Sequence, residues 1–192
     1  MPHVHRFFVE PQAVEETVAV LEGAEAHHAL HVVRVQSGDP VVLFDGQGRE
    51  LEGRVAAATR NDLKVEITGE RSIQPETHTL TLLQAALHRE KSIEELIRRC
   101  TELGVTGFVF FPAERSERRP KLSDKWRRWA IESCKQCKRL WLPDFRIAPS
   151  LEAALEGDWS ALLTATASVR PVPLRTAVTG NRIALAVGPE GD

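Results

Sequence analysis

Apolar runs alternate with amphipathic segments from residue 80 onward, and this alternation limits the possible folds more than any other feature of the chain. The runs LTLLQAAL, VTGFVFFPA, SALLTAT and RIALAVG predict strands. The first run is apolar on both faces, which is typical of a strand covered on both sides. Strands and helices that alternate in this way predict an α/β domain with a mostly parallel sheet.

Two longer segments between these runs have helical spacing. In the first, Ser92 and Glu95 form a capping-box pattern that predicts the start of a helix, and Gly104 is the expected stop. The second spans residues 123–141, with Ser123 as the expected N-cap. Both helices have an apolar face, so each is expected to pack on the sheet.

The first seventy residues predict a small β-rich domain. VHRFFV and NDLKVEIT have strand patterns, and VVLFDGQGRELEGRVAAA predicts two strands around a glycine-containing turn. EAHHALHVVRV has helical spacing. The polar segment SIQPETH contains a proline and ends the pattern. We therefore place one domain at residues 1–74 and a second at residues 78–192.

The composition is that of a globular protein outside the membrane, with 42% apolar and 27% charged residues. No stretch of 18 apolar residues is present, so no membrane association is expected. Three cysteines are too few for a disulfide framework, and the first ten residues do not resemble a signal peptide. We expect a cytoplasmic protein with reduced thiols.

Positive charge is concentrated in residues 115–139, which hold ten Lys or Arg and three Asp or Glu. On a helical wheel, one arc of the segment 123–141 is apolar and the other is basic. A solvated face is the plainer explanation, but the scarcity of acidic partners favours contact with phosphates. The apolar arc holds Trp126, Trp129, Ala130, Ser133, Cys137, Leu140 and Trp141, and the basic arc holds Lys125, Arg127, Arg128, Lys135, Lys138 and Arg139. The candidate nucleic-acid contacts are Arg34, Arg115, Arg118, Lys125, Arg128 and Arg139.

Two motifs could bind a metal but lack partners in the sequence. CKQC (134–137) has no second cysteine or histidine pair at zinc-finger spacing and lies within a predicted helix, so core packing is favoured over zinc or redox chemistry. His27 and His31 are spaced i, i+4, but no nearby Glu or Cys completes a ligand set. A structural or RNA-facing role is favoured for these histidines, and a structural metal remains the alternative. We predict no metal site, and no nucleophile–base pair stands out, so any chemistry requires a bound cofactor.

Five segments in the same order resemble one family, the RsmE-type 16S ribosomal RNA uridine-N3 methyltransferases of the SPOUT superfamily. HRFFV and HHALHVVRVQSGDPVVLFDGQGRE resemble its PUA-like RNA-binding domain, and QAALHREKSIEELIRRCTELGV resembles its first methyltransferase strand and helix. ERS and RWAIESCKQCKR resemble the next loop and helix, where the family tends to carry Glu, Gln and Arg at the places of Glu132, Gln136 and Arg139. LAVGPEGD resembles the family's cofactor loop.

The resemblance implies an S-adenosylmethionine-dependent enzyme that methylates N3 of a uridine in the 16S RNA of the small ribosomal subunit. It implies a SPOUT-type α/β knot domain behind a small PUA-like β-barrel, and a homodimer. A non-catalytic RNA-binding module is the alternative. The family's Leu-Gly-x-Arg-Ile-Leu-Arg-x-Glu-Thr segment, which completes the knot and the cofactor pocket, is not among these 192 residues. By resemblance, Arg6 is the candidate catalytic cation, and the candidate cofactor residues are Thr164, Gly188, Pro189, Glu190 and Gly191.

Overall fold

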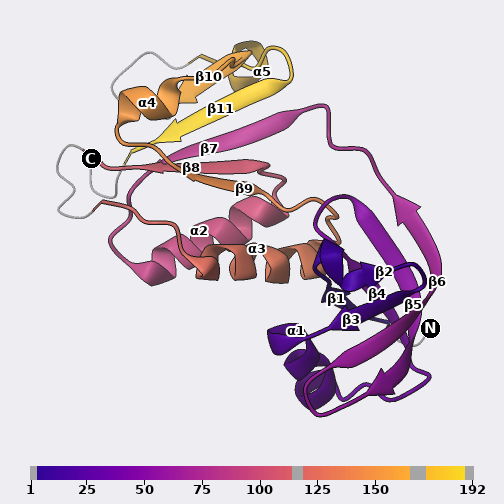
Figure 1. Ribbon diagram of the computed structural model, residues 1–192. Coiled ribbons are helices and arrows are strands. Elements are labelled where there is room, and N and C mark those ends of the chain that lie inside the picture. Colours follow the sequence, from indigo (N-terminus) through magenta and orange to yellow (C-terminus); the bar gives the residue numbers. More distant parts are fainter. Residues whose placement is uncertain (1–3, 114–118, 165–171, 189–192) are drawn as a thin grey trace. The chain divides into compact units, whose positions relative to one another are not determined.

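A computed structural model describes residues 4–113, 119–164 and 172–188 (Figure 1). The chain forms two compact units, each built around its own sheet. The first unit comprises Met1–Pro75 together with Cys134–Leu142, and the second comprises Glu76–Ser133 together with Pro143–Asp192. The predicted division at residues 72–78 had assigned 134–142 to the second domain, whereas the structure groups this short segment with the first unit.

The first unit contains a six-stranded sheet in the order β1-β4-β5-β6-β3-β2. The β1–β4 pair is parallel and the other pairs are antiparallel. Alternate residues of the long strands enter the core, as a half-buried sheet requires. The fully buried side chains include Phe7, Leu43, Leu51 and Leu63. The strands are β1 (His5–Phe8), β2 (Val14–Glu15), β3 (Val18–Leu21), β4 (Pro40–Phe44), β5 (Arg49–Ala58) and β6 (Leu63–Ser72).

The segment with helical spacing, EAHHALHVVRV, forms two kinds of helix in succession, the end of an α-helix and then a π-helix. A short 3-10 helix, Pro11–Ala13, lies between β1 and β2, and α1 (Gly23–His27) follows β3. The chain then continues as a π-helix, His28–Val33. Arg34 ends it in the left-handed region, with φ +63°. Helical spacing was therefore correct, but the i to i+4 pattern could not distinguish a π-helix from an α-helix.

The second unit contains a five-stranded sheet in the order β10-β11-β7-β8-β9, and every strand pair in it is parallel. This confirms the predicted mixed α/β fold, with a small sheet followed by a parallel one. In Figure 1, α2 and α3 lie side by side along this sheet. The elements are β7 (Thr79–Ala85), α2 (Glu90–Glu102), β8 (Gly107–Phe111), α3 (Asp124–Cys137), β9 (Asp144–Ile147), α4 (Leu151–Leu155), β10 (Ala161–Thr164), α5 (Leu174–Ala177) and β11 (Arg182–Val187).

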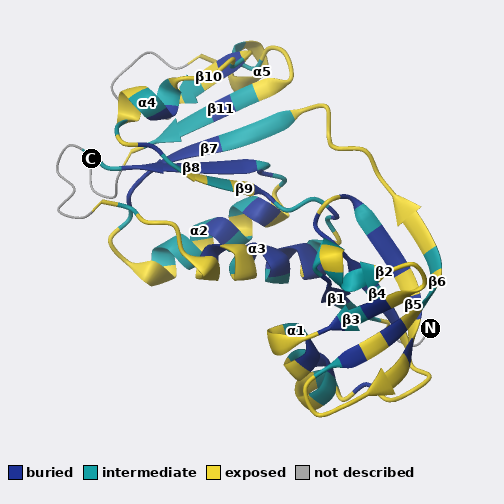
Figure 2. Ribbon diagram, viewed as in Figure 1, coloured by how far each residue is buried: buried dark blue, intermediate teal, exposed yellow. Residues whose placement is uncertain are grey.

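Both faces of β7 and β8 are covered, as their apolar runs predicted (Figure 2). One face carries a cluster that includes Leu83, Val109 and Ala154 of α4. On the other face, the ring of Phe110 lies 4.4 Å from the indole of Trp126, measured between centroids. This aromatic contact fixes α3 against the sheet. Among the described helices, none is long and apolar enough to cross a membrane.

Two helix boundaries differ from the prediction. Helix α2 begins at Glu90, and its N-cap is Arg89, which makes no side-chain capping bond, so the capping box at Ser92 was wrong. Its predicted stop is confirmed: Gly104 has φ +96° and its N–H donates to the Thr101 carbonyl at 3.2 Å. Helix α3 ends at Cys137 because Lys138 adopts a left-handed conformation, with φ +62°.

The residues after α3 pair with a turn of the first unit. The N–H of Gly48 donates to Leu140 at 3.0 Å, and the N–H of Leu142 donates to the carbonyl of Gly46 at 3.0 Å. Gly48 has φ +97°, and a Cβ there would lie 2.6 Å from a ring carbon of Trp141. This close approach explains why a glycine is needed at the turn.

An ion-pair network buries a carboxylate inside the first unit. Glu50 binds Arg71 at 2.5 Å and also binds Arg6, whose guanidinium lies 4.8 Å from the centre of the Phe44 ring. The side chains of Arg6 and Glu50 are only 12% and 11% exposed. Burial acts to raise the pKa of Glu50, but the hydrogen bonds from Arg71 and Arg6 outweigh it and the pKa lies below its usual value.

We expect Arg6→Ala to lower the free energy of unfolding by roughly 1.5–3 kcal/mol, because Glu50 loses a charged hydrogen bond but keeps Arg71. The control is Arg49→Ala, which removes the exposed pair with Glu70 and is expected to cost less than about 1 kcal/mol. Urea denaturation followed by circular dichroism measures both changes. Equal losses in the two variants would contradict the structural role of Arg6.

Candidate functional site

The carboxyl ends of three strands in the second unit meet at one edge of the parallel sheet. Residue pairing places Thr164 of β10 opposite Ala186 of β11, and Val187 of β11 opposite Gln84 of β7. The chain starts the sheet at β7, extends it through β8 and β9, and returns to add β11 on the opposite side of β7. Open α/β sheets bind ligands at such a switch in strand order, beyond the carboxyl ends.

Gln84 ties the chain after β11 to this edge. Its side chain is 2% exposed, and its amide nitrogen donates to the carbonyls of Ala85 at 3.0 Å and Gly188 at 3.3 Å. The buried amide therefore holds the backbone of Gly188 beside β7. Sequence analysis did not identify Gln84, although a lone amide inside a run of apolar residues is a signal because it must find buried partners.

Two of the predicted cofactor residues lie at this edge. Thr164 ends β10 and Gly188 directly follows β11, and both residues are exposed. Since β10 and β11 are neighbours, the structure brings the two residues to the same end of the sheet. Pro189, Glu190 and Gly191 lie outside the described residues.

Both units match known protein families. Residues 74–192 match the model described as an RNA methyltransferase domain, and residues 21–68 match an RNA methyltransferase PUA domain. The first match covers more than half of the chain.

The chain belongs to the RNA methyltransferase family.

Relatives agree with this assignment. Ribosomal RNA small subunit methyltransferase E of Synechocystis is 31% identical, over 97% of this chain and 64% of the relative's length, so the chain spans less than two thirds of that protein. A probable rRNA methyltransferase from Porphyromonas gingivalis has a TM-score of 0.83 and 26% identity, over 98% of this chain and 81% of that structure. Ribosomal RNA small subunit methyltransferase E of Neisseria gonorrhoeae, solved with S-adenosyl methionine, has a TM-score of 0.81, 23% identity and the same coverage, and supports the fold.

The basic face of α3 contains fewer exposed cations than the helical wheel predicted. Lys125, Arg127 and Arg128 are exposed, but Lys135 is not. The Lys135 side chain is 6% exposed, and its ammonium binds Glu25 at 2.9 Å. Placing Lys135 on the solvent face was therefore wrong, because its partner lies 110 residues away in the sequence.

The two cysteines of α3 differ in burial. Cys134 is fully buried, whereas Cys137, which the wheel placed on the apolar arc, is only partly buried. Burial raises the pKa of the Cys134 thiol to about 12, so it is not a thiolate near neutral pH. Core packing is therefore confirmed for Cys134.

The histidines of the PUA domain form no metal cluster with described residues. The rings of His27 and His31 lie 4.7 Å apart, but no group of three or more His, Cys, Asp or Glu side chains in the described ranges could hold a metal. His28 is different, because its Nδ1 is buried and has no hydrogen-bond partner among the described residues, and its ring meets Phe7 edge to face.

The other residues that were predicted to contact RNA or the reacting base differ in their exposure. Arg34 is exposed at the end of the π-helix, and Arg139 is partly buried. Arg115 and Arg118 lie outside the described residues. Arg6 is buried against Glu50, as described above, and its role as a catalytic cation stays a prediction.

Two tryptophans that share the predicted apolar arc differ in burial, and this gives a stability test. Trp126 is 5% exposed and packs on Phe110, whereas Trp129 is only partly buried. We expect Trp126→Ala to cost about 3–5 kcal/mol of unfolding free energy and Trp129→Ala roughly half as much. Urea denaturation measures both, and a larger loss at Trp129 would mean that the two indoles are placed wrongly.

Proposed function

We propose that the protein carrying this chain transfers a methyl group from S-adenosylmethionine to N3 of a uridine in 16S ribosomal RNA. The observation that carries the proposal is the edge where β7, β10 and β11 end together, with Gln84 holding the carbonyl of Gly188. Family membership supports methyl transfer to RNA. The relative from Neisseria gonorrhoeae, whose structure contains S-adenosyl methionine, supports the choice of methyl donor.

The described residues at this edge fit such a cofactor. Gly188 has no Cβ, so a ligand can approach its backbone closely, and it is exposed at the end of β11. The exposed Thr164 adds a hydroxyl at the neighbouring strand end. We propose that these two residues hold the cofactor, with Pro189, Glu190 and Gly191 following in the chain. When bound, the cofactor supplies the electrophilic methyl group.

The side chains of the protein have to position the uridine and stabilise the negative charge that forms on its base. The N3–H lies on the pairing edge of uracil, so the base must be unpaired or flipped out before it reacts. Loss of the N3 proton leaves negative charge on the base, which nearby cations stabilise. Arg6 is already engaged by Glu50, so its ion pair favours a structural role over this one.

RNA binding is proposed for the exposed cations. Lys125 and Arg128 lie on the same helix, and Arg34 lies in the unit that matches a PUA domain. Their exposure leaves these three side chains accessible to phosphates. Arg139 is proposed with them, as are Arg115 and Arg118. A homodimer remains a prediction from the family resemblance.

The test is methyl transfer to small ribosomal subunits. The protein is incubated with methyl-labelled S-adenosylmethionine and subunits that lack the modification, and the product is mapped by primer extension. Because a methyl group at N3 blocks base pairing, we expect reverse transcription to stop next to one uridine. Labelling at a different atom would disprove the N3 assignment. RNA binding without any transfer would favour the non-catalytic RNA-binding module.

The role of Gln84 gives a sharper prediction. Gln84→Leu keeps the volume but leaves the Gly188 carbonyl without its donor, so we expect the Kd for S-adenosylmethionine to rise about three- to tenfold. Isothermal titration calorimetry measures the affinity. The exposed Gln136→Leu is the matched control and should leave the Kd unchanged. An unaltered Kd in Gln84→Leu would show that the amide does not support the cofactor loop.

A further inference from the structure

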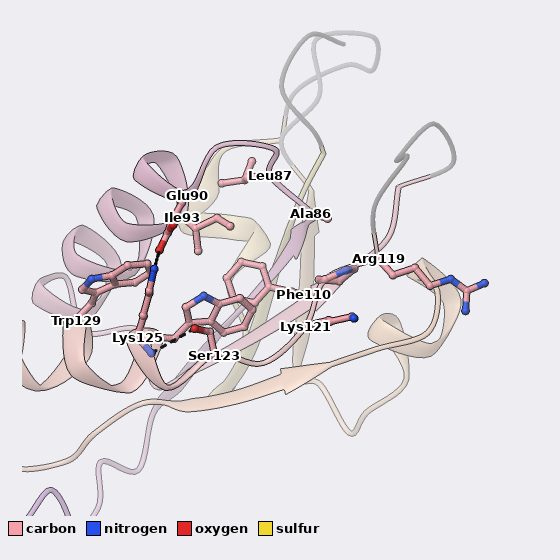
Figure 3. A pocket seen from close by; sticks show the side chains of 12 residues that line it. Ala86, Leu87, Glu90, Ile93, Phe110, Arg119, Lys121, Ser123, Lys125 and Trp129 are labelled. Carbon is pink, nitrogen blue, oxygen red and sulfur yellow. Dashed lines mark hydrogen bonds and ion pairs between the residues drawn. The ribbon is translucent and has the colours of Figure 1, made fainter.

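A cavity of about 360 Å³ lies in the second unit, where β7 and β8 lead toward α2 and α3 (Figure 3). Its walls include Ala86 and Leu87 after β7, the first turn of α2, Phe110 of β8, and residues 119–129 around the start of α3. No described residue of β10 or β11 lines it. The cavity is therefore separate from the edge that carries Thr164 and Gly188.

One end of the cavity is aromatic. Phe110 and Trp126 are 1% and 5% exposed and contact one another, so they form a rigid apolar surface. Trp129 also lines the cavity but is only partly buried. Part of its indole therefore remains available to a ligand. Aromatic side chains of this kind provide platforms on which nucleobases stack.

The other end is cationic. Figure 3 shows Trp129 and the Glu90–Lys125 ion pair at one side of the group, with Arg119 and Lys121 extending at the other. Glu90 is the one acidic residue among the described lining residues, and Lys125 already neutralises it. Neither Arg119 nor Lys121 forms an ion pair with a described residue. Among the described residues, these two cations thus have no acidic partner and can bind an anion.

We propose that this cavity binds one unpaired nucleotide that flanks the methylated uridine in the RNA substrate. The base stacks on Trp129, and the phosphate binds Arg119 and Lys121. The proposal rests on the proposed function, since it takes RNA as the substrate. A nucleotide matches the cavity because it has a flat aromatic end and an anionic end, and the cavity has one surface for each.

Size and topology limit the occupant further. A volume of 360 Å³ is near the lower end of the range of about 300–1,000 Å³ for ligand sites, which suits one nucleotide better than a longer stretch. The reacting uridine must reach the methyl donor, which we place beyond β11. The nucleotide in the cavity is therefore a neighbour of the target.

The test of stacking uses a fluorescein-labelled hexauridylate and fluorescence anisotropy. We expect Trp129→Ala to raise the Kd about tenfold and Trp129→Phe to stay within about threefold of the unaltered protein, because an aromatic ring is retained. Thermal unfolding verifies that both variants are folded. Equal affinity in Trp129→Ala, or no binding of hexauridylate by the unaltered protein, would overturn the nucleotide site.

The test of phosphate contact uses the salt dependence of the same binding. Each single-stranded phosphate that the protein neutralises contributes about 0.7 to the slope of log K against log salt, so the double variant Arg119→Ala/Lys121→Ala, which frees the one bound phosphate, should reduce the slope by about 0.7. Arg146→Ala is the matched control, because Arg146 is an exposed arginine of β9 that does not line the cavity. An equal change in the control would mean that the effect is one of general charge, and would overturn the assignment.

Methyl transfer by the unaltered protein separates the two proposals. If transfer occurs while Trp129→Ala binds hexauridylate normally, the nucleotide site is wrong and the proposed function stands. If the unaltered protein transfers no methyl group to ribosomal subunits, the proposed function is wrong whatever the oligonucleotide shows. We expect Trp129→Ala to raise the KM for ribosomal subunits about tenfold with a smaller change in kcat, since a flanking contact acts on binding.

Discussion

The backbone hydrogen bonds of β11 join β10 to β7, and this pairing brings the carboxyl ends of the three strands together at the candidate ligand site. β11 pairs with β7 over six residues and with β10 over four, and β10 has no other partner in the described sheet. The turn before β11 is fixed as well, since Ser160 Oγ accepts from the N–H groups of Asn181 and Arg182. Because all pairs in the sheet are parallel, the carboxyl ends of β7 and β11, which come first and last along the chain, lie at the same edge. Residues separated by a hundred positions, such as Gln84 and Gly188, can then share a hydrogen bond.

The first unit depends on contacts that the local sequence pattern does not contain. Glu25 accepts from the backbone of Phe8 at 3.0 Å and also binds Lys135, so one carboxylate joins β1, α1 and the last turn of α3. The turn at Gly46–Gly48 adds backbone bonds to the residues after α3. A buried lysine with no partner would be strongly unfavourable, so Glu25 and Lys135 are needed together.

The sequence was sufficient for eight of the eleven described strands because burial on both faces or on alternate faces determines their apolar pattern, whereas β2, β3 and β9 were not predicted. It was also sufficient for the end of α2, where Gly104 adopts a conformation that favours glycine. It failed for Lys135, because a helical wheel assumes that each residue type faces its usual environment and cannot include a partner from a distant segment. The sequence analysis also missed Gln84, because this residue is part of an apolar strand and its role depends on hydrogen bonds to two backbone carbonyls.

The position of β7 explains how the proposed cofactor edge and the proposed nucleotide cavity could serve one reaction. Gln84 is paired in register with Val187 of β11 on one side and with Phe110 of β8 on the other. Gly188 follows Val187 directly, and Phe110 lines the cavity. The three adjacent strands β11, β7 and β8 span two strand spacings, about 10 Å. The proposed cofactor edge and the part of the cavity that Phe110 lines are therefore separated by β7 alone. A methyl donor on one side and a bound nucleotide on the other would leave the adjoining base between them, which is where a base that reacts with the donor has to lie.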